Sequence, residues 1–269
     1  MPAVGPRRIV RCTTDRVPGL RPAERDAMYA LMERYYEGCE RAQFERDLAE
    51  KQYVLRLFDA EGGLCGFSTI QLLEFEHGGR RAVCVFSGDT VIDRACWGQK
   101  RLQRAFAAFL LRLRLSRRGR VYWFLISKGY KTYLFMRHNL RSYPNHAEET
   151  PPEVQAVLDR VARLKYPENY DPVRGVISFA GPAQAVREVH RDLEAKDLAD
   201  PDIRFFVERN PGYARGDELC CLAEVTLRGV AYGLWRYGVL HPLRRLFGRE
   251  ARPRGGVSAP GATASAPRG

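Results

Sequence analysis

The stretch VCVFSGDTVID (residues 83–93) continues directly into RACWGQKRLQRAF (94–106), and VYWFLISKGYKTYLF (121–135) follows after a further basic, helix-like stretch. The first segment is rich in β-branched and aromatic residues and predicts a strand, in which Gly88 indicates a bulge or a close approach of another backbone. Beyond Trp97-Gly98 the apolar residues recur with a helical period and the remaining positions are largely basic. A strand, a helix and a second strand from Val121 to Ile126 predict parallel pairing inside a mixed sheet.

Upstream of this block, the spacing of apolar residues predicts helices and then antiparallel strands. A short leading strand is followed by a helical pattern from Pro22 to Ala49, interrupted once, which predicts two helices. Tyr53–Phe58 and Leu64–Phe75 read as a hairpin, and Gly78-Gly79 closes the next one. Three consecutive antiparallel strands are therefore expected before the basic helix.

The second half of the chain predicts a more irregular arrangement. The expected elements are a helix over Tyr130–Asn139, a helix starting near Pro152, a strand over Val176–Phe179, a helix over Ala183–Lys196, a strand over Ile203–Val207 and an apolar helix from Asp217 onward. The last 22 positions consist mainly of Gly, Ala, Pro, Ser and Arg, which cannot bury a core and predict disorder. We therefore expect a core over 1–148, an extension with helices and one or two strands over 149–247, and a disordered tail over 248–269.

The composition limits the class of protein. With 269 residues and 45% hydrophobic residues the chain can fill a core, and its net charge of +12 favours an acidic or anionic partner. Seven cysteines without a CxxC pair or a Cys/His cluster argue against a disulfide scaffold and against a structural zinc, and we predict no metal site. The chain has no signal-peptide pattern and no apolar run of about 18 residues, so we expect a cytoplasmic protein.

The predicted order of strand, two helices, three antiparallel strands, basic helix, strand and helix resembles the GNAT superfamily of N-acyltransferases. The resemblance covers about residues 9–145 and is carried by the three segments quoted above. It implies an α/β fold with a GNAT-like mixed, mostly antiparallel central sheet flanked by helices, here with an α+β C-terminal extension. It also implies that the pantetheine arm of the donor lies where the fourth strand splays from the fifth, and that the next helix N-terminus binds the pyrophosphate.

The family's phosphate loop usually reads Arg or Gln, two residues, Gly, one residue, then Gly or Ala, and the aligned stretch here is WGQKRL (97–102). Only Gly98 matches, since Lys100 and Leu102 replace small residues, but Arg101 and Arg104 add positive charge. Such a loop is compatible with an acyl-carrier-protein thioester as donor, and a solvated Arg-rich face is the structural alternative. The candidate donor-binding residues are Val91, Ile92, Trp97, Gly98, Gln99, Lys100, Arg101, Leu102 and Ser127.

Catalysis in this superfamily is direct attack of an amine on a thioester, often with a Tyr that protonates the leaving thiolate. The resemblance implies Tyr133 as that acid, with Tyr130 on nearly the same helix face. Asp89 is a candidate base or amine-orienting group, because a carboxylate in a half-buried strand is costly unless it is paired. Glu74, with Glu76 on the same side of its strand, is a candidate to activate a substrate ammonium. The structural alternatives are a Tyr packed on the sheet, an Asp bonded to bulge N–H groups, and glutamates on a solvent face.

The sequence thus predicts an N-acyltransferase that moves an acyl group from a CoA or acyl-carrier-protein thioester to an amine, without a metal. The expected partners are a small-molecule or peptide amine, an acidic acyl carrier protein and, weakly, an anionic membrane. One alternative is a non-catalytic GNAT-like module that binds nucleic acid or an acidic protein through the basic helix, although nucleic acid is the less expected partner. Another is a peripheral membrane protein anchored by the basic, amphipathic segment from Leu219 to Phe247.

Overall fold

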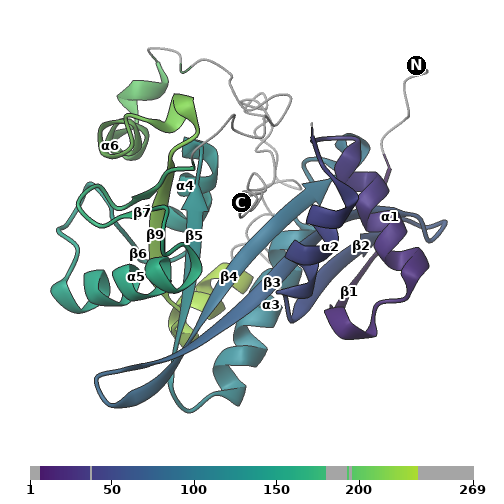
Figure 1. The fold of residues 1–269 in the computed structure, drawn as a ribbon, viewed down its shortest axis with the longest axis horizontal. Helices are drawn as coiled ribbons and strands as arrows, with labels where there is room; N and C mark the ends of the chain where they lie inside the picture. The colour runs from purple at the N-terminus through teal and green to yellow at the C-terminus, as the bar shows by residue number, and fades with distance from the viewer. Residues whose placement is uncertain (1–6, 37, 180–192, 194–195, 236–269) are drawn as a thin grey trace.

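The computed structural model describes residues 7–36, 38–179, 193 and 196–235, and Figure 1 shows their arrangement. The strands are β1 (Arg11–Arg16), β2 (Tyr53–Phe58), β3 (Leu64–His77), β4 (Arg80–Ile92), β5 (Arg120–Ser127), β6 (Ser142–Tyr143), β7 (Tyr170–Asp171), β8 (Val176–Ile177) and β9 (Glu218–Glu224). The α-helices are α1 (Pro22–Glu33), α2 (Arg41–Ala49), α3 (Arg101–Ser116), α4 (Tyr130–Arg137), α5 (Pro152–Lys165), α6 (Pro201–Arg209) and α7 (Leu227–Trp235). The helix predicted over 183–196 and the tail predicted over 248–269 lie almost entirely outside the described residues.

The described strands form one sheet of nine strands in the order β1-β2-β3-β4-β5-β9-β8-β7, with β6 also paired to β9. Strands β1 to β4 pair antiparallel, β4 and β5 pair parallel, and every later pair is antiparallel. The mixed, mostly antiparallel sheet expected from the sequence is therefore confirmed, as is the parallel crossover through α3. Strand β9 extends the same sheet that β1 to β5 begin.

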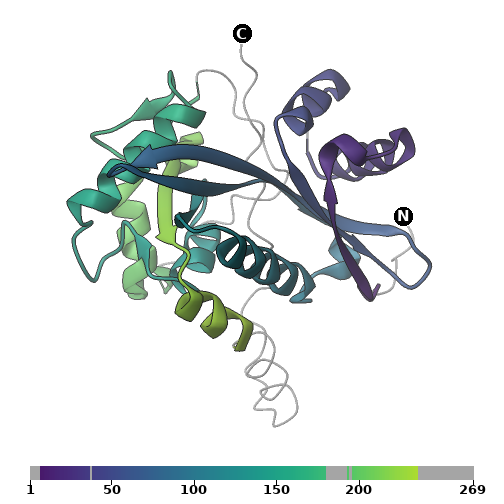
Figure 2. The same cartoon turned by 90° about the horizontal axis from the view of Figure 1, so that it is seen from below.

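Helices cover both faces of the sheet, as the two views in Figures 1 and 2 show. Helices α1, α2 and α5 lie on one face, and α3 and α7 lie on the other. Along β5, Phe124 and Ile126 pack with the α5 side chains, whereas Trp123 and Leu125 pack with those of α3. Burial on both faces explains why this strand is a continuous apolar run rather than an alternating one.

Strand β4 contains a bulge at Gly88. Two steps along β3, from Ser68 to Ile70, correspond to three steps along β4, from Thr90 to Ser87. The extra residue inverts the alternation of side chains, so β4 residues on either side of the bulge switch faces. The irregularity expected from a glycine inside this strand is thus confirmed.

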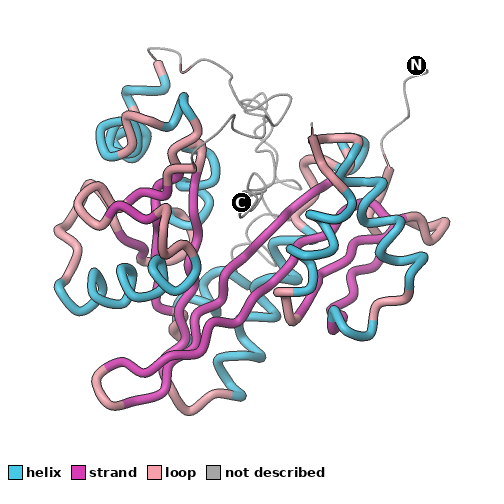
Figure 3. Tube along the Cα trace, viewed as in Figure 1, coloured by secondary structure: helices cyan, strands magenta, loops and turns pink. Residues whose placement is uncertain are grey.

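Strands β4 and β5 separate just after they begin to pair. Their ladder runs from Ala82–Arg120 to Phe86–Phe124 and stops there. The indole N–H of Trp123 donates to the Ser87 hydroxyl (3.2 Å) at the point of separation. Farther along, β4 pairs with β3 and β5 pairs with β9, so the two traces diverge in Figure 3. In the described part of the chain, the facing edges of the two strands have no ladder partner.

Two elements predicted for the second half are wrong. The segment Ile203–Val207 lies in helix α6, where the Asp200 side chain accepts from the Asp202 N–H and Pro201 occupies the first turn. The segment after Asp217 begins as strand β9 rather than as a helix, and helix α7 starts only at Leu227. A fully buried strand has no polar alternation, so periodicity does not distinguish it from a buried helix.

Candidate functional site

The structure assembles one site where β4 and β5 separate. Both strands run toward this opening, so the two helices that follow them, α3 and α4, begin beside it. The bulge of β4 and the first residues of β9 lie on its two sides. Unpaired edges of β4 and β5 thus border this opening, with Asp89 on β4 and Glu218 at the start of β9, which pairs with the end of β5.

The N-terminus of α3 has unsatisfied backbone N–H groups. Lys100 at the N-cap makes no side-chain cap, and the first helical bond joins the Arg104 N–H to the Lys100 carbonyl (3.1 Å). The N–H groups of Arg101, Leu102 and Gln103 therefore have no acceptor within the helix. The first turn contains no acidic residue, and the helix extends for 16 residues. Its positive end, with three basic side chains nearby, suits a phosphate group.

Two predicted donor-binding residues hold the loop before α3 in place. The Gln99 side chain accepts from the Ile9 N–H (2.9 Å) and donates to the Arg7 carbonyl (2.7 Å). The indole N–H of Trp97 donates to the Ile92 carbonyl (2.9 Å), while its ring stays 41% exposed. These contacts fix the loop, so Gln99 positions the helix N-terminus and the exposed Trp97 ring is available to a ligand.

The other predicted donor-binding residues differ in their exposure to solvent. Gly98 has a φ of +78°, a conformation that favours glycine and turns the chain into α3. Val91, Ile92 and Leu102 are buried in the core, so they contribute backbone groups and packing only. Ser127 is fully buried, and its hydroxyl donates to the carbonyl at the N-cap of α4 (2.8 Å).

Asp89 is a buried carboxylate next to the bulge. It is 4% exposed, and its Oδ1 atom has no hydrogen-bond partner among the described residues. Burial raises the pKa of Asp89 to about 6, and the positive charge of Lys51 opposes that rise. A methyl group on Gly88 would lie 2.9 Å from Lys51 Cε and 2.5 Å from Thr69 Oγ1, so glycine permits this packing. A buried, ionisable carboxylate with one oxygen atom free of hydrogen bonds to the described residues is the strongest candidate for a base.

A second buried carboxylate, which sequence reasoning missed, begins strand β9. Glu218 is fully buried, with Lys128 Nζ 3.2 Å from its Oε1 atom. Burial raises the pKa of Glu218 to about 7, and Lys128 opposes the rise. The buried Tyr166 hydroxyl has no hydrogen-bond partner in the described chain and interacts electrostatically with Glu218 and Asp89. The available signal was a single Glu at the head of an apolar run, which we interpreted as a helix.

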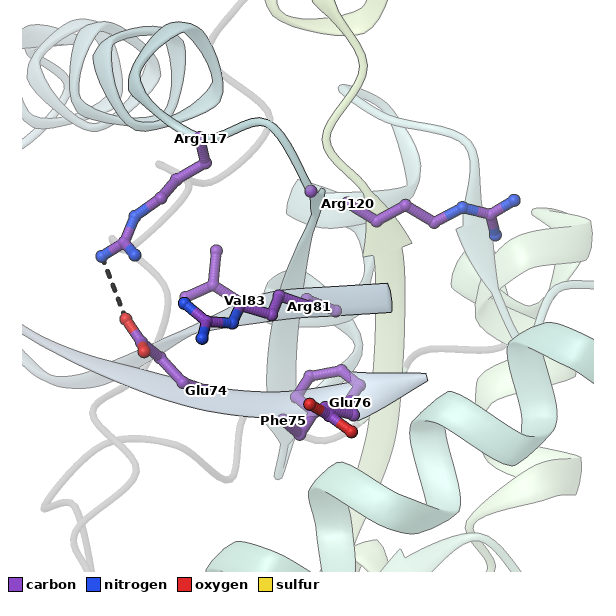
Figure 4. A pocket seen from close by; sticks show the side chains of 9 residues that line it. Glu74, Phe75, Glu76, Arg81, Val83, Arg117 and Arg120 are labelled. Carbon is purple, nitrogen blue, oxygen red and sulfur yellow. Dashed lines mark ion pairs between the residues drawn. The ribbon is translucent and has the colours of Figure 1, made fainter. Parts of the chain in front are cut away.

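Glu74 lines a pocket beside the β3–β4 hairpin, and Figure 4 shows its side chain pointing toward Arg117. It pairs with Val83 on the closed part of the sheet, its side chain is 64% exposed, and it forms an ion pair with Arg117 (3.0 Å). Glu76 lines the same pocket of about 270 Å³, which the side chains of the β3–β4 hairpin and the end of α3 enclose. The structure does not bring Glu74 to Asp89, so a substrate-activating role beside Asp89 is not supported by its position.

Tyr133 and Tyr130 occupy different environments on α4. The Tyr133 ring is 1% exposed and packs against Phe205 and Phe206 of α6. Its hydroxyl donates to the Pro144 carbonyl (3.2 Å), and burial raises its pKa. Tyr130, the first residue of the helix, is half-buried beside the opening. The contacts of Tyr133 favour packing over proton donation.

Replacing Tyr133 with phenylalanine tests this assignment. We expect Tyr133→Phe to lower stability by about 1 kcal/mol through the lost hydrogen bond, and to leave turnover within a few-fold of wild type. Urea unfolding and steady-state kinetics measure the two effects, with Tyr130→Phe as the matched variant on the same helix. A loss of turnover of about 10²-fold in Tyr133→Phe alone would make Tyr133 the acid.

The described residues show neither a metal cluster nor a spanning helix. No group of three or more His, Cys, Asp or Glu side chains is placed to hold a metal ion in the described ranges. None of the helices within the described chain is long and apolar enough to cross a lipid bilayer. The membrane-binding segment predicted from Leu219 starts instead as buried strand β9, and its residues beyond 235 lie outside the described chain.

No family model and no curated protein matches the chain. Similar proteins were found among solved structures. A conserved protein of unknown function from Enterococcus faecalis is 14% identical to this chain, with a TM-score of 0.37. The match covers 48% of this chain and 32% of the Enterococcus protein, so this chain spans about a third of that protein. A GNAT family N-acetyltransferase from Escherichia coli in complex with CoA is 16% identical (TM-score 0.36; 48% and 68% covered). A GNAT family acetyltransferase from Brucella melitensis in complex with acetyl-CoA is 14% identical (TM-score 0.30; 42% and 75% covered).

The fold class follows from the order and pairing of the elements themselves. The elements follow one another in the order β1-α1-α2-β2-β3-β4-α3-β5-α4, and β4 and β5 pair in parallel before they separate. This is the arrangement on which the resemblance to the GNAT superfamily rests. The protein has a GNAT-like fold.

Proposed function

We propose that the protein transfers an acyl group from a thioester donor to an amine. The observation that carries this proposal is the separation of parallel strands β4 and β5 beside the uncapped N-terminus of α3. An extended pantetheine arm fits between two unpaired strand edges because their backbone groups can bond to its amides as a third strand would. Its phosphate would lie on the α3 N–H groups, with Lys100 and Arg101 adding charge.

The donor is CoA or an acyl carrier protein, because both present a phosphopantetheine arm. Lys100, Arg101 and Arg104 lie at the N-terminus of α3. This positive surface suits the phosphates of CoA as well as the acidic surface of a carrier protein.

Asp89 is the proton acceptor of the proposed reaction. It takes one proton from the substrate ammonium, and the neutral amine attacks the thioester carbonyl. The new C–N bond forms, the C–S bond breaks, and the second amine proton passes to the thiolate, so the products are an amide and a thiol. Asp89 then releases its proton to solvent. Backbone N–H groups on the β4 edge suit the oxyanion of the tetrahedral intermediate.

Thermal stabilisation by candidate donors tests the proposed function. We expect one of acetyl-CoA, long-chain acyl-CoA or acyl carrier protein to raise the melting temperature, since a ligand that binds only the folded state stabilises it. Lys100→Ala/Arg101→Ala should weaken that donor's affinity by about tenfold or more, because two charge-assisted contacts to phosphate are lost. Arg114→Ala/Arg118→Ala removes the same charge at the other end of α3 and should change affinity by less than about twofold.

Other results would favour the alternatives. A cooperative melt that no donor shifts, together with salt-sensitive binding to nonspecific DNA, would support a nucleic-acid-binding module instead. Equal weakening in the two double variants would mean that the whole basic face acts through its net charge, and not through a phosphate site at the helix N-terminus.

A further inference from the structure

Buried charges continue from the bulge of β4 toward helix α2. Lys51 follows that helix, and its side chain has no exposed surface. Its Cε atom packs against Gly88, where even a methyl group would approach it to 2.9 Å. Its ammonium donates to the Asp47 carbonyl (2.9 Å) and lies 4.0 Å from the Glu50 carboxylate. Lys51 is thus a buried cation in contact with the residue that precedes Asp89.

Helix α5 supplies a second buried cation to the same group. Lys165, the last residue of α5, is 5% exposed and bonds to the Glu50 carboxylate. The Glu50 side chain is 36% exposed, so this end of the group reaches solvent. Lys165 Nζ also lies 5.5 Å from the centre of the Phe86 ring, which belongs to the last β4 pair before the opening. The cluster therefore connects the end of α2 to the end of α5.

The charge of Asp89 depends on these neighbours. The titratable or charged groups around it come from the α1–α2 loop, from α2 and the residues that follow it, and from the end of α5: Cys39, Asp47, Glu50, Lys51, Lys165 and Tyr166. Burial and the Asp47 carboxylate raise the pKa of Asp89, and the positive charge of Lys51 is the strongest effect that lowers it. Burial, with repulsion from Lys165, in turn lowers the pKa of Lys51.

We infer that Lys51 is a positioning residue that keeps Asp89 ionised near neutral pH, so that Asp89 can accept the proton of the acyl acceptor. The inference rests on the proposed function, since it assigns Asp89 the role of base. Lys51 itself touches neither donor nor acceptor. Gly88 is part of the arrangement, because it lets the Lys51 stem approach the backbone beside the carboxylate.

A purely structural role for Lys51 predicts a different outcome. Its ammonium bonds to a carbonyl in the last turn of α2, and a lysine at a helix C-terminus stabilises the helix there. Loss of that bond would lower stability equally at every pH. Lys51→Gln keeps a hydrogen-bond donor and removes the charge, and Lys51→Arg keeps the charge, so the two variants separate the roles.

The experiment measures the pH at which Asp89 ionises, without requiring turnover. Urea unfolding from about pH 4 to about pH 9 is compared between each protein and its own Asp89→Asn counterpart. The pH above which their difference in stability levels off reports the Asp89 midpoint in the folded state. We expect a midpoint near pH 6 in the wild type. It should rise by about one pH unit or more in Lys51→Gln and stay near the wild-type value in Lys51→Arg. The acidic limb of the pH–rate profile should move by the same amount.

Each outcome decides the inference. An unchanged midpoint in Lys51→Gln overturns it. If that variant does not fold, Lys51→Met, which keeps the apolar stem and removes the charge, takes its place, and an unchanged midpoint there overturns the inference. A shifted midpoint with an unshifted acidic limb shows that Asp89 is not the base. A shifted midpoint in a protein without turnover for any donor removes the proposed function while the coupling of Lys51 to Asp89 stands.

Discussion

Replacing Asp89 with asparagine should lower the rate of acyl transfer by about 10²- to 10⁴-fold, because the reaction loses its proton acceptor. Donor affinity should stay unchanged, since Asp89 lies on the bulge of β4 and the proposed phosphate site lies at the N-terminus of α3. Single-turnover kinetics at saturating donor measure the first effect, and donor-induced thermal stabilisation measures the second.

A matched carboxylate serves as the control for this prediction. Glu74→Gln removes an exposed carboxylate on β3 that lies outside the opening, and turnover should stay at the wild-type level. Full activity in Asp89→Asn, or an equal loss in Glu74→Gln, would contradict the placement of the site.

Removing the Asp89 carboxylate should also change how the stability of the fold depends on pH. Burial raises the pKa of Asp89 from 3.8 to about 6, so the folded state binds this proton more tightly than the unfolded state does. The stabilisation from the bound proton is complete below about pH 4 and is lost as pH rises through about 6, at about 1.4 kcal/mol per pKa unit. Asp89→Asn lacks this loss, so its stability relative to the wild type should rise by about 2–3 kcal/mol between about pH 4 and about pH 8.

The second large effect concerns the pair formed by Glu218 and Lys128. Lys128→Met should destabilise the protein increasingly as pH rises, by about 3 kcal/mol at alkaline pH, because it leaves a fully buried carboxylate without its cation. Burial already raises the pKa of Glu218 from 4.5 to about 7, and removal of Lys128 raises it further. Below the midpoint Glu218 is protonated in both proteins, so their stabilities should converge at low pH.

A double variant separates this charge effect from lost packing. Glu218→Gln/Lys128→Met removes both charges and should recover most of the stability that Lys128→Met loses. Urea unfolding at pH 5 and at about pH 8.5 measures the difference. A loss that is equal at the two pH values would show that the Lys128 stem contributes packing and not charge compensation.

The first half of the fold was predictable because its signals are local. β-Branched and aromatic runs between glycine turns predict β2, β3 and β4, and the change of period after Trp97-Gly98 predicts α3. Gly88 inside a strand predicted the bulge that positions Asp89. Each of these features depends on a few neighbouring residues, so the sequence alone suffices to find it.

The second half depends on long-range packing that no local pattern reveals. The residues of β9 read as a helix because burial on both faces removes the polar alternation of a strand. In α6, aromatic and β-branched residues favoured a strand, and the Asp200-Pro201 helix start outweighed them. For the same reason Lys51 and Glu218 were missed as site residues, since only the folded sheet brings them beside Asp89 or the opening.

The place of β9 in the sheet has a consequence for the newly made chain. The apolar strand β5 pairs with β9, which is synthesised about a hundred residues later. At common rates of translation, synthesis of the intervening residues takes on the order of 5–20 s. During that interval the open edge of β5 can template pairing with another chain. A fragment ending before Glu218 would keep the edge open permanently, so we expect such fragments to aggregate where the longer chain folds.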